Sequence, residues 1–352
     1  KAVGLDEHHA QVTFTEIDTT AYGNGNFRTE VAEQRTMGIN SHKIDLLGNF
    51  ISELPERITP QEANAELERI DSMPHLYKRW MLALASAVAC AGFAFLNRGG
   101  LIECSAVFIA AGLGQFLRST LMKRGVSHMA IWMACGFLSA GAYIGLINLL
   151  TGLQLIGSEH MVGFISSILF LVPGFPMVTG MLDISRMDLL AGMSRLMYVT
   201  VLLVSASFAV WVLASLFHLP LAQNARPDIP AGLYLLLQVV SSGVAAAGFA
   251  MLFAASPVAC VWGGVIAAVA SPARIWLVEA GWTSHMAATL AVFAVGIMAE
   301  LVAPLHGRQY SRISLSVPAV VTMVPGVPFY LAMSHMYSGD LYAAMGGFAQ
   351  SF

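Results

Sequence analysis

Charged residues are scarce in this sequence, and their scarcity limits the class of protein that it can encode. Only 11% of the 352 residues are charged and 57% are hydrophobic, whereas roughly 25% of the residues of a soluble domain are charged. Residues 1–80 hold 13 of the 21 acidic residues and 8 of the 18 lysines and arginines. The chain therefore divides into a polar, acidic head at 1–78 and a long apolar body. It has no basic stripe, which argues against a nucleic-acid partner.

The sequence also lacks the motifs of several enzyme and metal-binding classes. It contains no Walker A sequence, no GxSxG and no HExxH, so nothing indicates an ATP-driven pump, a hydrolase of that kind or a zinc protease. Its four cysteines form no CxxC pair, which indicates neither a disulfide framework nor a zinc site. We expect a protein that is not an enzyme and that needs no cofactor or metal.

Long apolar segments fill the body, each close to the roughly 20 residues that a helix needs to cross a bilayer. Alternating strands are absent, so helices are predicted, because the bilayer core offers no water to unpaired backbone groups. The ten segments lie at about 80–97, 101–117, 129–150, 161–180, 190–217, 231–252, 257–273, 285–303, 313–333 and from 341 onward. The tenth is cut short at Phe352, so we expect it to be incomplete.

The lysines and arginines of the short connections predict the orientation of these spans. With the head in the cytoplasm, nine of them fall inside: Lys78, Arg79, Arg118, Lys123, Arg124, Arg186, Arg195, Arg308 and Arg312. Three fall outside: Arg98, Arg226 and Arg274. The positive-inside rule therefore predicts a multi-pass membrane protein with its N-terminal head in the cytoplasm.

Two apolar segments are interrupted in the same way, by VPGFP at 172–176 and VPGVP at 324–328. Proline and glycine both disfavour the interior of a helix. The residues around them, 171–193 and 323–345, align without a gap. Shorter matches precede them in the same order: AGFA at 91–94 and 247–250, IAA at 109–111 and 266–268, and SHMA at 127–130 and 284–287.

These matches predict two related membrane repeats, at 79–217 and 218–352. Each repeat holds five spans, and since five is odd, the second would enter the membrane in the opposite direction. The predicted fold is a polytopic α-helical membrane protein with about ten transmembrane helices in two inverted-topology repeats. A small α+β domain precedes them.

Inverted repeats are typical of secondary transporters, in which substrate binds near the midplane on interrupted helices. The residues of the two breaks are therefore candidate substrate contacts: Pro173, Gly174, Pro176, Pro325, Gly326 and Pro328. A break frees backbone groups for a ligand, and the N-terminus of the second half-helix favours a carboxylate. The alternative is that these prolines only kink helices for packing.

Ionisable groups in or beside the spans are costly and usually functional. Asp183 and Asp188 follow the first break, Asp340 is the counterpart of Asp188 in the second repeat, and Glu300 ends the eighth span. Each could carry a coupling proton if partial burial raises its pKa, or be a solvated charge at a helix end. Arg195 could bind a substrate carboxylate, pair with Asp188 or extend to the membrane interface.

The head is predicted to contain a hairpin and two helices. Residues 10–39 alternate around GNGN as a hairpin does, and residues 40–54 indicate a helix. A second helix begins at TPQEANAELERI, where Thr59, Pro60 and Glu62 fit a capping box. Such a domain could regulate transport, bind a partner or simply act as a scaffold.

The chain resembles the threonine/serine exporter (ThrE-type) family. The resemblance rests on LVPGFPMVTGMLDISRMDLLAGMSR, on VPAVVTMVPGVPFYLAM and on TPQEANAELERI, and it covers residues 10–352. It implies a cytoplasmic head, about ten spans in two related halves, and export of L-threonine and L-serine driven by the proton motive force. Split relatives are linked to dicarboxylate export. The residues that match the family motifs are Pro173, Gly174, Asp183, Asp188, Arg195, Pro325 and Gly326, whereas His335 stands where the first repeat has an acid.

We therefore expect a proton-coupled secondary exporter of small amino acids that works by alternating access around the two breaks. A dicarboxylate exporter, a solute channel, a membrane enzyme and a receptor-like scaffold are the other readings. The expected partners are the amino-acid substrate, protons and the lipid bilayer, and a homo-oligomer is left open.

Overall fold

The structure is a computed structural model that describes residues 4–23, 25–34, 38–219, 227–304, 310–324 and 326–351. Three antiparallel strands open the chain and pair in the order β1-β2-β3: β1 (Glu7–Val12), β2 (Glu16–Gly23) and β3 (Asn26–Glu33). The β2–β3 hairpin closes between Gly23 and Asn26, within the GNGN segment that predicts the turn. The expected hairpin is therefore present, and β1 adds a strand that begins before the predicted segment.

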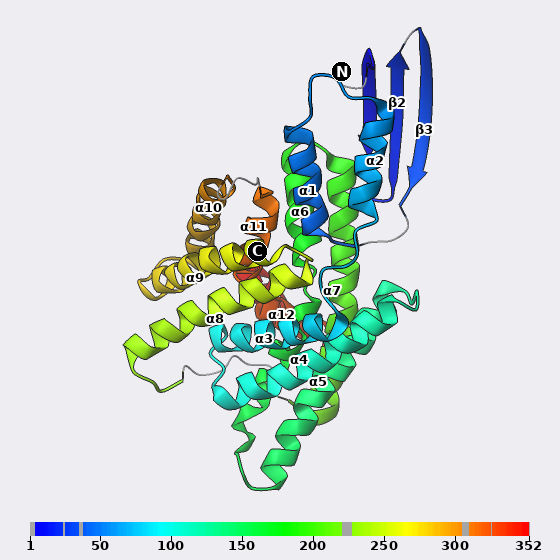
Figure 1. Cartoon of the computed structure of the whole chain (residues 1–352). Coiled ribbons are helices and arrows are strands. Elements are labelled where there is room, and N and C mark those ends of the chain that lie inside the picture. The colour runs from blue at the N-terminus through cyan, green and yellow to red at the C-terminus, as the bar shows by residue number, and fades with distance from the viewer. Residues whose placement is uncertain are drawn as a thin grey trace.

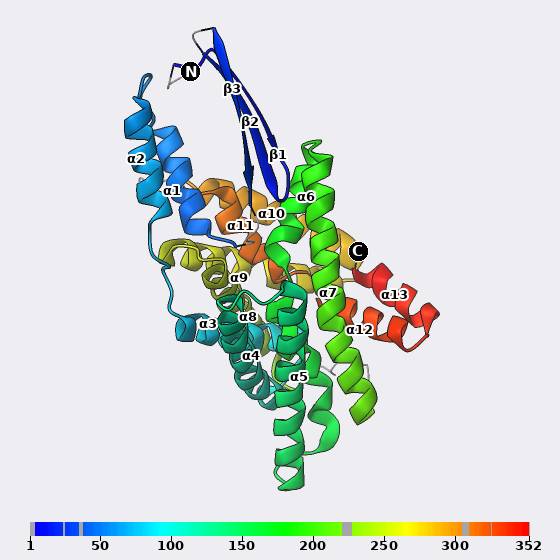
Figure 2. The ribbon, with the colours of Figure 1, turned by 90° about the vertical axis from the view of Figure 1, so that its right-hand side faces the viewer.

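Two helices complete the head, α1 (Ser41–Ser52) and α2 (Pro60–Asp71). The predicted capping box of α2 is confirmed, because Thr59 accepts from the N–H of Glu62 and the Glu62 carboxylate accepts from the N–H of Thr59. Figures 1 and 2 place the sheet and both helices at one end of the molecule, beside the ends of α6 (Gly174–Ser185) and α7 (Leu189–Phe217).

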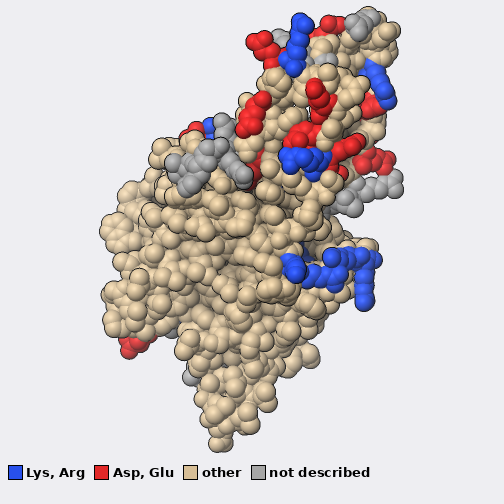
Figure 3. Space-filling model, viewed as in Figure 1, with Lys and Arg blue, Asp and Glu red and all other residues tan. Residues whose placement is uncertain are grey.

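Helices alone make up the described part of the body. Seven of them are long and apolar enough to cross a bilayer: α3 (Arg79–Leu96), α4 (Leu101–Met122), α5 (His128–Gly152), α7, α8 (Ala231–Leu252), α9 (Pro257–Glu279) and α10 (Ser284–Val302). The space-filling view shows the charges gathered over the head, while the visible face of the body carries few (Figure 3). The chain is therefore a multi-pass helical membrane protein.

Two further candidate spans are bent at a break. The 3-10 helix η1 (Ser158–Leu171) meets α6 at 60°, and α11 (Arg312–Val321) meets α12 (Gly326–Tyr337) at 56°. Within the described residues this gives seven spans, or nine if each bent pair counts as one. The predicted number of ten is not reached, because α13 (Leu341–Ser351) has 11 residues and a span needs roughly 20.

The centre of the body is a crossing of α3 and α8 that depends on two glycines. A Cβ on Gly92 would lie 2.8 Å from the carbonyl oxygen of Ser241, and a Cβ on Gly248 would lie 2.6 Å from that of Ala85. Gly92 and Gly248 hold the same place in the two AGFA matches, and Ala85 and Ser241 each precede their own match by the same number of residues. The contact is thus reciprocal, since equivalent residues of the two sequence repeats meet each other.

The head docks onto the body through the first turns of α1. The N–H of Ser41 donates to the Phe253 carbonyl at 2.9 Å, and the N–H of His42 donates to that of Ala254 at 3.1 Å. Asp45 is buried there, and its Oδ1 accepts from the Ser311 N–H at 2.8 Å and from Ser314 Oγ at 2.9 Å.

The environment of Asp45 is unfavourable for a charge. Its second oxygen, Oδ2, is buried and has no hydrogen-bond partner among the described residues. Burial raises the pKa of this carboxyl to about 6, against the opposing effect of the hydrogen bonds from Ser311 and Ser314. The head therefore places a titratable acid against the N-terminus of α11, the first half of the second bent pair.

Candidate functional site

The first break is a complete interruption of the helix. The N–H of Gly174 donates to the Val172 carbonyl at 2.8 Å, which closes a tight turn around Pro173. Pro176 lies in the first turn of α6, where its missing N–H costs no hydrogen bond. The prolines therefore end one helix and start another, which is more than the kink that the packing alternative requires.

The second break repeats this geometry. The N–H of Gly326 donates to the Val324 carbonyl at 2.8 Å, and Pro328 lies in the first turn of α12, as Pro176 does in α6. Pro325, the counterpart of Pro173, lies outside the described residues. The likeness of the two breaks in sequence thus extends to their hydrogen bonding.

The two breaks lie against each other. A Cβ on Gly174 would come within 2.3 Å of Cγ2 of Val321, which ends α11. A Cβ on Gly326 would come within 3.0 Å of Leu169 Cδ2 and 3.3 Å of Val172 Cγ2, beside the first break. Each break therefore packs, through a glycine, on the residues that precede the other.

A small apolar pocket lies between the breaks. It is lined by Phe93, Leu169, Val172, Phe249, Val321, Val324 and Gly326. Its volume of about 10 Å³ holds roughly one water-sized sphere, whereas sites for small molecules measure about 300–1,000 Å³. The two breaks are thus closed against each other. The sequence predicts that a break frees backbone groups for a ligand, but the Gly174 N–H donates within its own turn and does not face a cavity.

The acids after the first break do not share one role. Asp183, in the last turn of α6, pairs with Arg195 of α7 at 3.2 Å, and both side chains are partly buried. Asp188 caps α7, because its Oδ1 accepts from the N–H of Ala191 at 3.4 Å. Of the roles left open for Arg195, an ion pair is present, but its partner is Asp183, and the carboxylate of Asp188 turns to its own helix N-terminus.

Asp340 and Glu300, the two acids predicted from the second half of the body, are both exposed, as Asp188 is. Asp340 accepts from the N–H of Ala343 at 3.1 Å at the start of α13, as Asp188 does at the start of α7. Helix capping is therefore a sufficient reason for the repeated acid. Glu300 is exposed and forms an ion pair with Arg312 of α11, with one contact of 2.7 Å.

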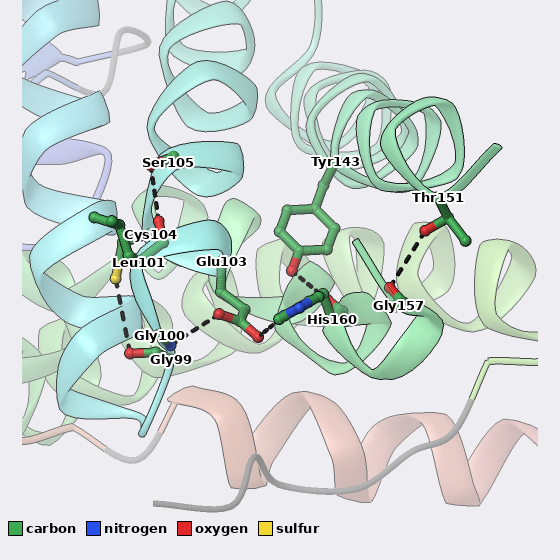
Figure 4. Close-up of polar contacts among 10 residues, drawn as sticks. All are labelled: Gly99, Gly100, Leu101, Glu103, Cys104, Ser105, Tyr143, Thr151, Gly157 and His160. Atoms are coloured by element: carbon green, nitrogen blue, oxygen red, sulfur yellow. Dashed lines mark hydrogen bonds and ion pairs between the residues drawn. The ribbon is translucent and has the colours of Figure 1, made fainter. Parts of the chain in front are cut away.

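A buried acid that the sequence reasoning missed lies in the first turn of α4. Glu103 is 7% exposed, and its Oε1 is 2.7 Å from Nδ1 of His160 in η1 (Figure 4). Its Oε2 accepts from the N–H of Gly100 at 2.9 Å, and Tyr143 of α5 donates to the His160 carbonyl at 2.6 Å. Among the described residues of the body, Glu103 is the one acid that is buried. A glutamate inside an apolar span was itself the signal that could have found it.

Arg118, in the last turns of α4, is a second missed residue. Its Nη1 donates to the Phe170 carbonyl at 3.4 Å, and its guanidinium lies 4.4 Å from the centre of the Trp132 ring. Trp132 in turn donates to the Leu171 carbonyl at 2.6 Å. Among the described residues no acid pairs with Arg118, although an arginine offers five N–H donors.

Comparison with known proteins assigns the family. The model of the family described as "Putative threonine/serine exporter" matches residues 1–217, and the one described as "Threonine/Serine exporter, ThrE" matches residues 238–352. The chain belongs to the threonine/serine exporter family. The first ThrE match ends at the last residue of α7, and the second begins inside α8.

Two curated proteins that are similar to this chain are named for a different substrate. The ThrE chain is 26% identical over 195 residues to the "Probable succinate transporter subunit YjjP" of Escherichia coli (strain K12), covering 55% of this chain and 74% of the relative. The protein of the same name from Klebsiella aerogenes is 23% identical over 195 residues, with the same coverage. No solved structure gives a significant match.

Proposed function

We propose that this ThrE-family chain is a secondary-active exporter of small carboxylate-bearing metabolites, with L-threonine and L-serine as the first candidates. It would lie in the bacterial inner membrane with its head in the cytoplasm. Family membership and the seven long apolar helices support export across a membrane. The observation that carries the proposal is the direct contact between two helix breaks of the same local geometry.

The reciprocal contacts support an inverted repeat. Gly92 meets Ser241 as Gly248 meets Ala85, and Gly174 meets Val321 as Gly326 meets Leu169. A two-fold axis between two repeats brings equivalent residues together in this way. Rocking one repeat against the other would separate the breaks on one side of the membrane at a time, which is alternating access.

The closed pocket fits an occluded state of such a cycle. Opening would expose the breaks, and we propose that Pro173, Gly174, Pro176, Pro325, Gly326 and Pro328 line the transport path. The N-terminus of α6 has no side-chain cap, so its positive end is available to the carboxylate of a substrate.

Arg118 is better placed than Arg195 to receive that carboxylate first. Arg195 is already paired with Asp183, whereas Arg118 lies beside the carbonyl of Phe170, just before the break, with no acidic partner among the described residues. A guanidinium with unused donors can bind a carboxylate in a two-pronged geometry.

Proton coupling is the second part of the proposal. Among the acids predicted from sequence, Asp183 is the best-supported candidate for the proton carrier, because its partly buried ion pair with Arg195 joins α6 to α7. Protonation of Asp183 would release Arg195 and loosen that joint. Asp188, Asp340 and Glu300 are further candidates, although capping and an exposed ion pair already account for their positions.

Dicarboxylates are the second candidate substrate class, favoured by the names of the relatives. The word subunit in those names also supports a partner chain or a second copy. A dicarboxylate would present the same carboxylate chemistry to Arg118 and to the end of α6. The two classes therefore differ in their remaining groups, because threonine and serine carry an ammonium beside the carboxylate and a hydroxyl, whereas a dicarboxylate carries a second carboxylate.

Counterflow in liposomes tests the proposal. Purified protein is reconstituted into vesicles that contain unlabelled L-threonine, and labelled L-threonine is added outside, with and without a pH gradient. Saturable uptake that serine inhibits and the gradient shifts is expected. Uptake of labelled succinate but not threonine would move the substrate to dicarboxylates. A flux that does not saturate would instead indicate a channel.

A further inference from the structure

We propose that Glu103 and His160 form the outer proton-binding site of this exporter, and that its protonation state controls the conformation of η1. The inference rests on the proposed proton coupling and extends it to two residues and one moving element. In the proposed orientation α3 leaves the cytoplasm, so the α3–α4 turn and the connection between α5 and η1 face outward. The Glu103–His160 pair lies between these two connections.

The pair is suited to bind one proton. The His160 side chain is 18% exposed and the Glu103 side chain 10%, so in the proposed orientation outer water would reach the imidazole first. When a proton from that water binds to the imidazole, an imidazolium–carboxylate pair forms over the 2.7 Å contact. When the proton leaves, the carboxylate stays buried with no opposite charge, which is unfavourable. No bond other than that to the proton forms or breaks.

Two titratable side chains that are ordinarily uncharged lie beside Glu103. Apart from His160, the titratable groups that face Glu103 within the described part of the chain are the Cys104 thiol of α4 and the Tyr143 phenol of α5. Groups of both kinds are ordinarily neutral near pH 7. Tyr143 is fully buried and holds the backbone of His160 through its carbonyl. Among these groups, we therefore propose that the His160 imidazole is the one that changes its charge, next to the Glu103 carboxylate.

The position of the pair links it to the first break. His160 lies in the first turn of η1, and η1 ends at Leu171, immediately before Val172 and Pro173. Side chains hold both ends of this element. Glu103 and Tyr143 hold the first turn, and Arg118 and Trp132 bind the last two carbonyls. Loss of the anchor at one end therefore acts on the break at the other.

Because η1 is a 3-10 helix, releasing its first turn could displace the break by a large distance. It is a 3-10 helix of 14 residues, although runs beyond about 3–4 residues are uncommon because their hydrogen bonds are less well aligned. Fourteen residues span about 28 Å as a 3-10 helix and about 21 Å as an α-helix. A release of the first turn that lets η1 relax toward the α form would thus pull or rotate the break by several ångströms.

Two measurements test the inference on the full chain. The first is counterflow in liposomes at fixed inner pH, with the outer pH varied from about 5.5 to 8, a range that brackets an ordinary histidine. Glu103→Gln keeps an acceptor for the Gly100 N–H, and His160→Gln keeps a hydrogen bond to Glu103. Glu279→Gln removes an exposed acid at the end of α9 and serves as the control.

The wild type and the control are expected to respond to the outer pH, by at most about tenfold per pH unit for a one-proton site. Both substitutions of the pair should flatten this response while exchange continues. The inference is overturned if folded Glu103→Gln and His160→Gln proteins retain the wild-type response. Tyr143→Phe provides a milder variant, which leaves both titrating groups in place and should keep the response.

The second measurement is amide hydrogen exchange of residues 158–171 at the two ends of that pH range. It needs no substrate, so it separates this inference from the proposed transport. Protection that changes with pH in the wild type and not in Glu103→Gln supports control of η1 even if threonine is not carried. Protection that is independent of pH in the wild type overturns that control even if threonine export is established.

Discussion

Phe93 and Phe249 meet edge to face at the centre of the body, with ring centroids 6.3 Å apart and planes at 88°. They hold the same place in the two AGFA matches, and both line the small pocket between the helix breaks. A pair of equivalent aromatic rings in contact marks the place where the two AGFA stretches meet. Changes in packing at this centre should therefore alter transport.

Gly174→Ala should destabilise the closed breaks by about 1–3 kcal/mol, because the new methyl group overlaps Val321 and overpacks the contact. Thermal unfolding of the purified protein and counterflow measure the two consequences. Adding Val321→Ala should restore much of both, since it removes the overlapping atoms. Gly145→Ala is the matched control, as a Cβ there meets no atom within 4 Å. A Gly174→Ala protein with unchanged stability and transport would contradict the close packing of the breaks.

Arg118→Gln should raise the KM for a carboxylate substrate about tenfold or more, which corresponds to the loss of about 1.4 kcal/mol. The effect should appear when substrate is presented from the head side. Arg118→Lys keeps the charge and should lose less, although it lacks the two-pronged geometry. Arg124→Gln removes an exposed cation just after α4 and should behave like the wild type. A loss of Vmax alone, at constant KM, would instead assign Arg118 a purely structural role at the end of η1.

Asp183→Asn should weaken the dependence of counterflow on the inner pH, because it removes the group that is proposed to release its proton there. The loss of stability should stay within about 1 kcal/mol, since both members of the pair with Arg195 are partly exposed. Asp183→Glu keeps the charge and is the matched control. If the dependence on inner pH survives in Asp183→Asn, the proton leaves through another residue.

Asp45 should make the stability of the protein depend on pH. Its folded pKa of about 6 lies above the ordinary 3.8, so its stabilising contribution is complete below about pH 4 and is lost as pH rises through 6. Between these limits the change is about 1.4 kcal/mol per pH unit. Thermal unfolding of the full chain at about pH 5 and 7.5 measures it.

Asp45→Asn resembles the protonated acid at every pH, so its melting temperature should fall less than that of the wild type between these two values. Glu53→Gln removes an exposed acid beside the C-terminus of α1 and should leave the wild-type difference in place. Equal pH dependence of Asp45→Asn and the wild type would show that the carboxyl does not carry the effect.

The sequence by itself determined the positions of seven long apolar helices and of the two helix breaks. Seven predicted spans coincide with long helices, and the two VPGxP stretches coincide with the two bends, because bilayer crossing and proline chemistry are read from consecutive residues. The capping box of α2 is likewise local, since Thr59 and Glu62 are three positions apart.

Only the tertiary structure decided which distant groups meet. The pairing of Arg195 with Asp183 instead of Asp188 depends on how α6 packs on α7, and the pairing of Glu103 with His160 joins residues on two helices. The contact of Gly174 with Val321 likewise joins residues far apart in the sequence. The physical reason is that hydropathy and helix propensity act over a few residues, whereas an ion pair or a close glycine contact requires helices far apart in sequence to be placed to within about an ångström.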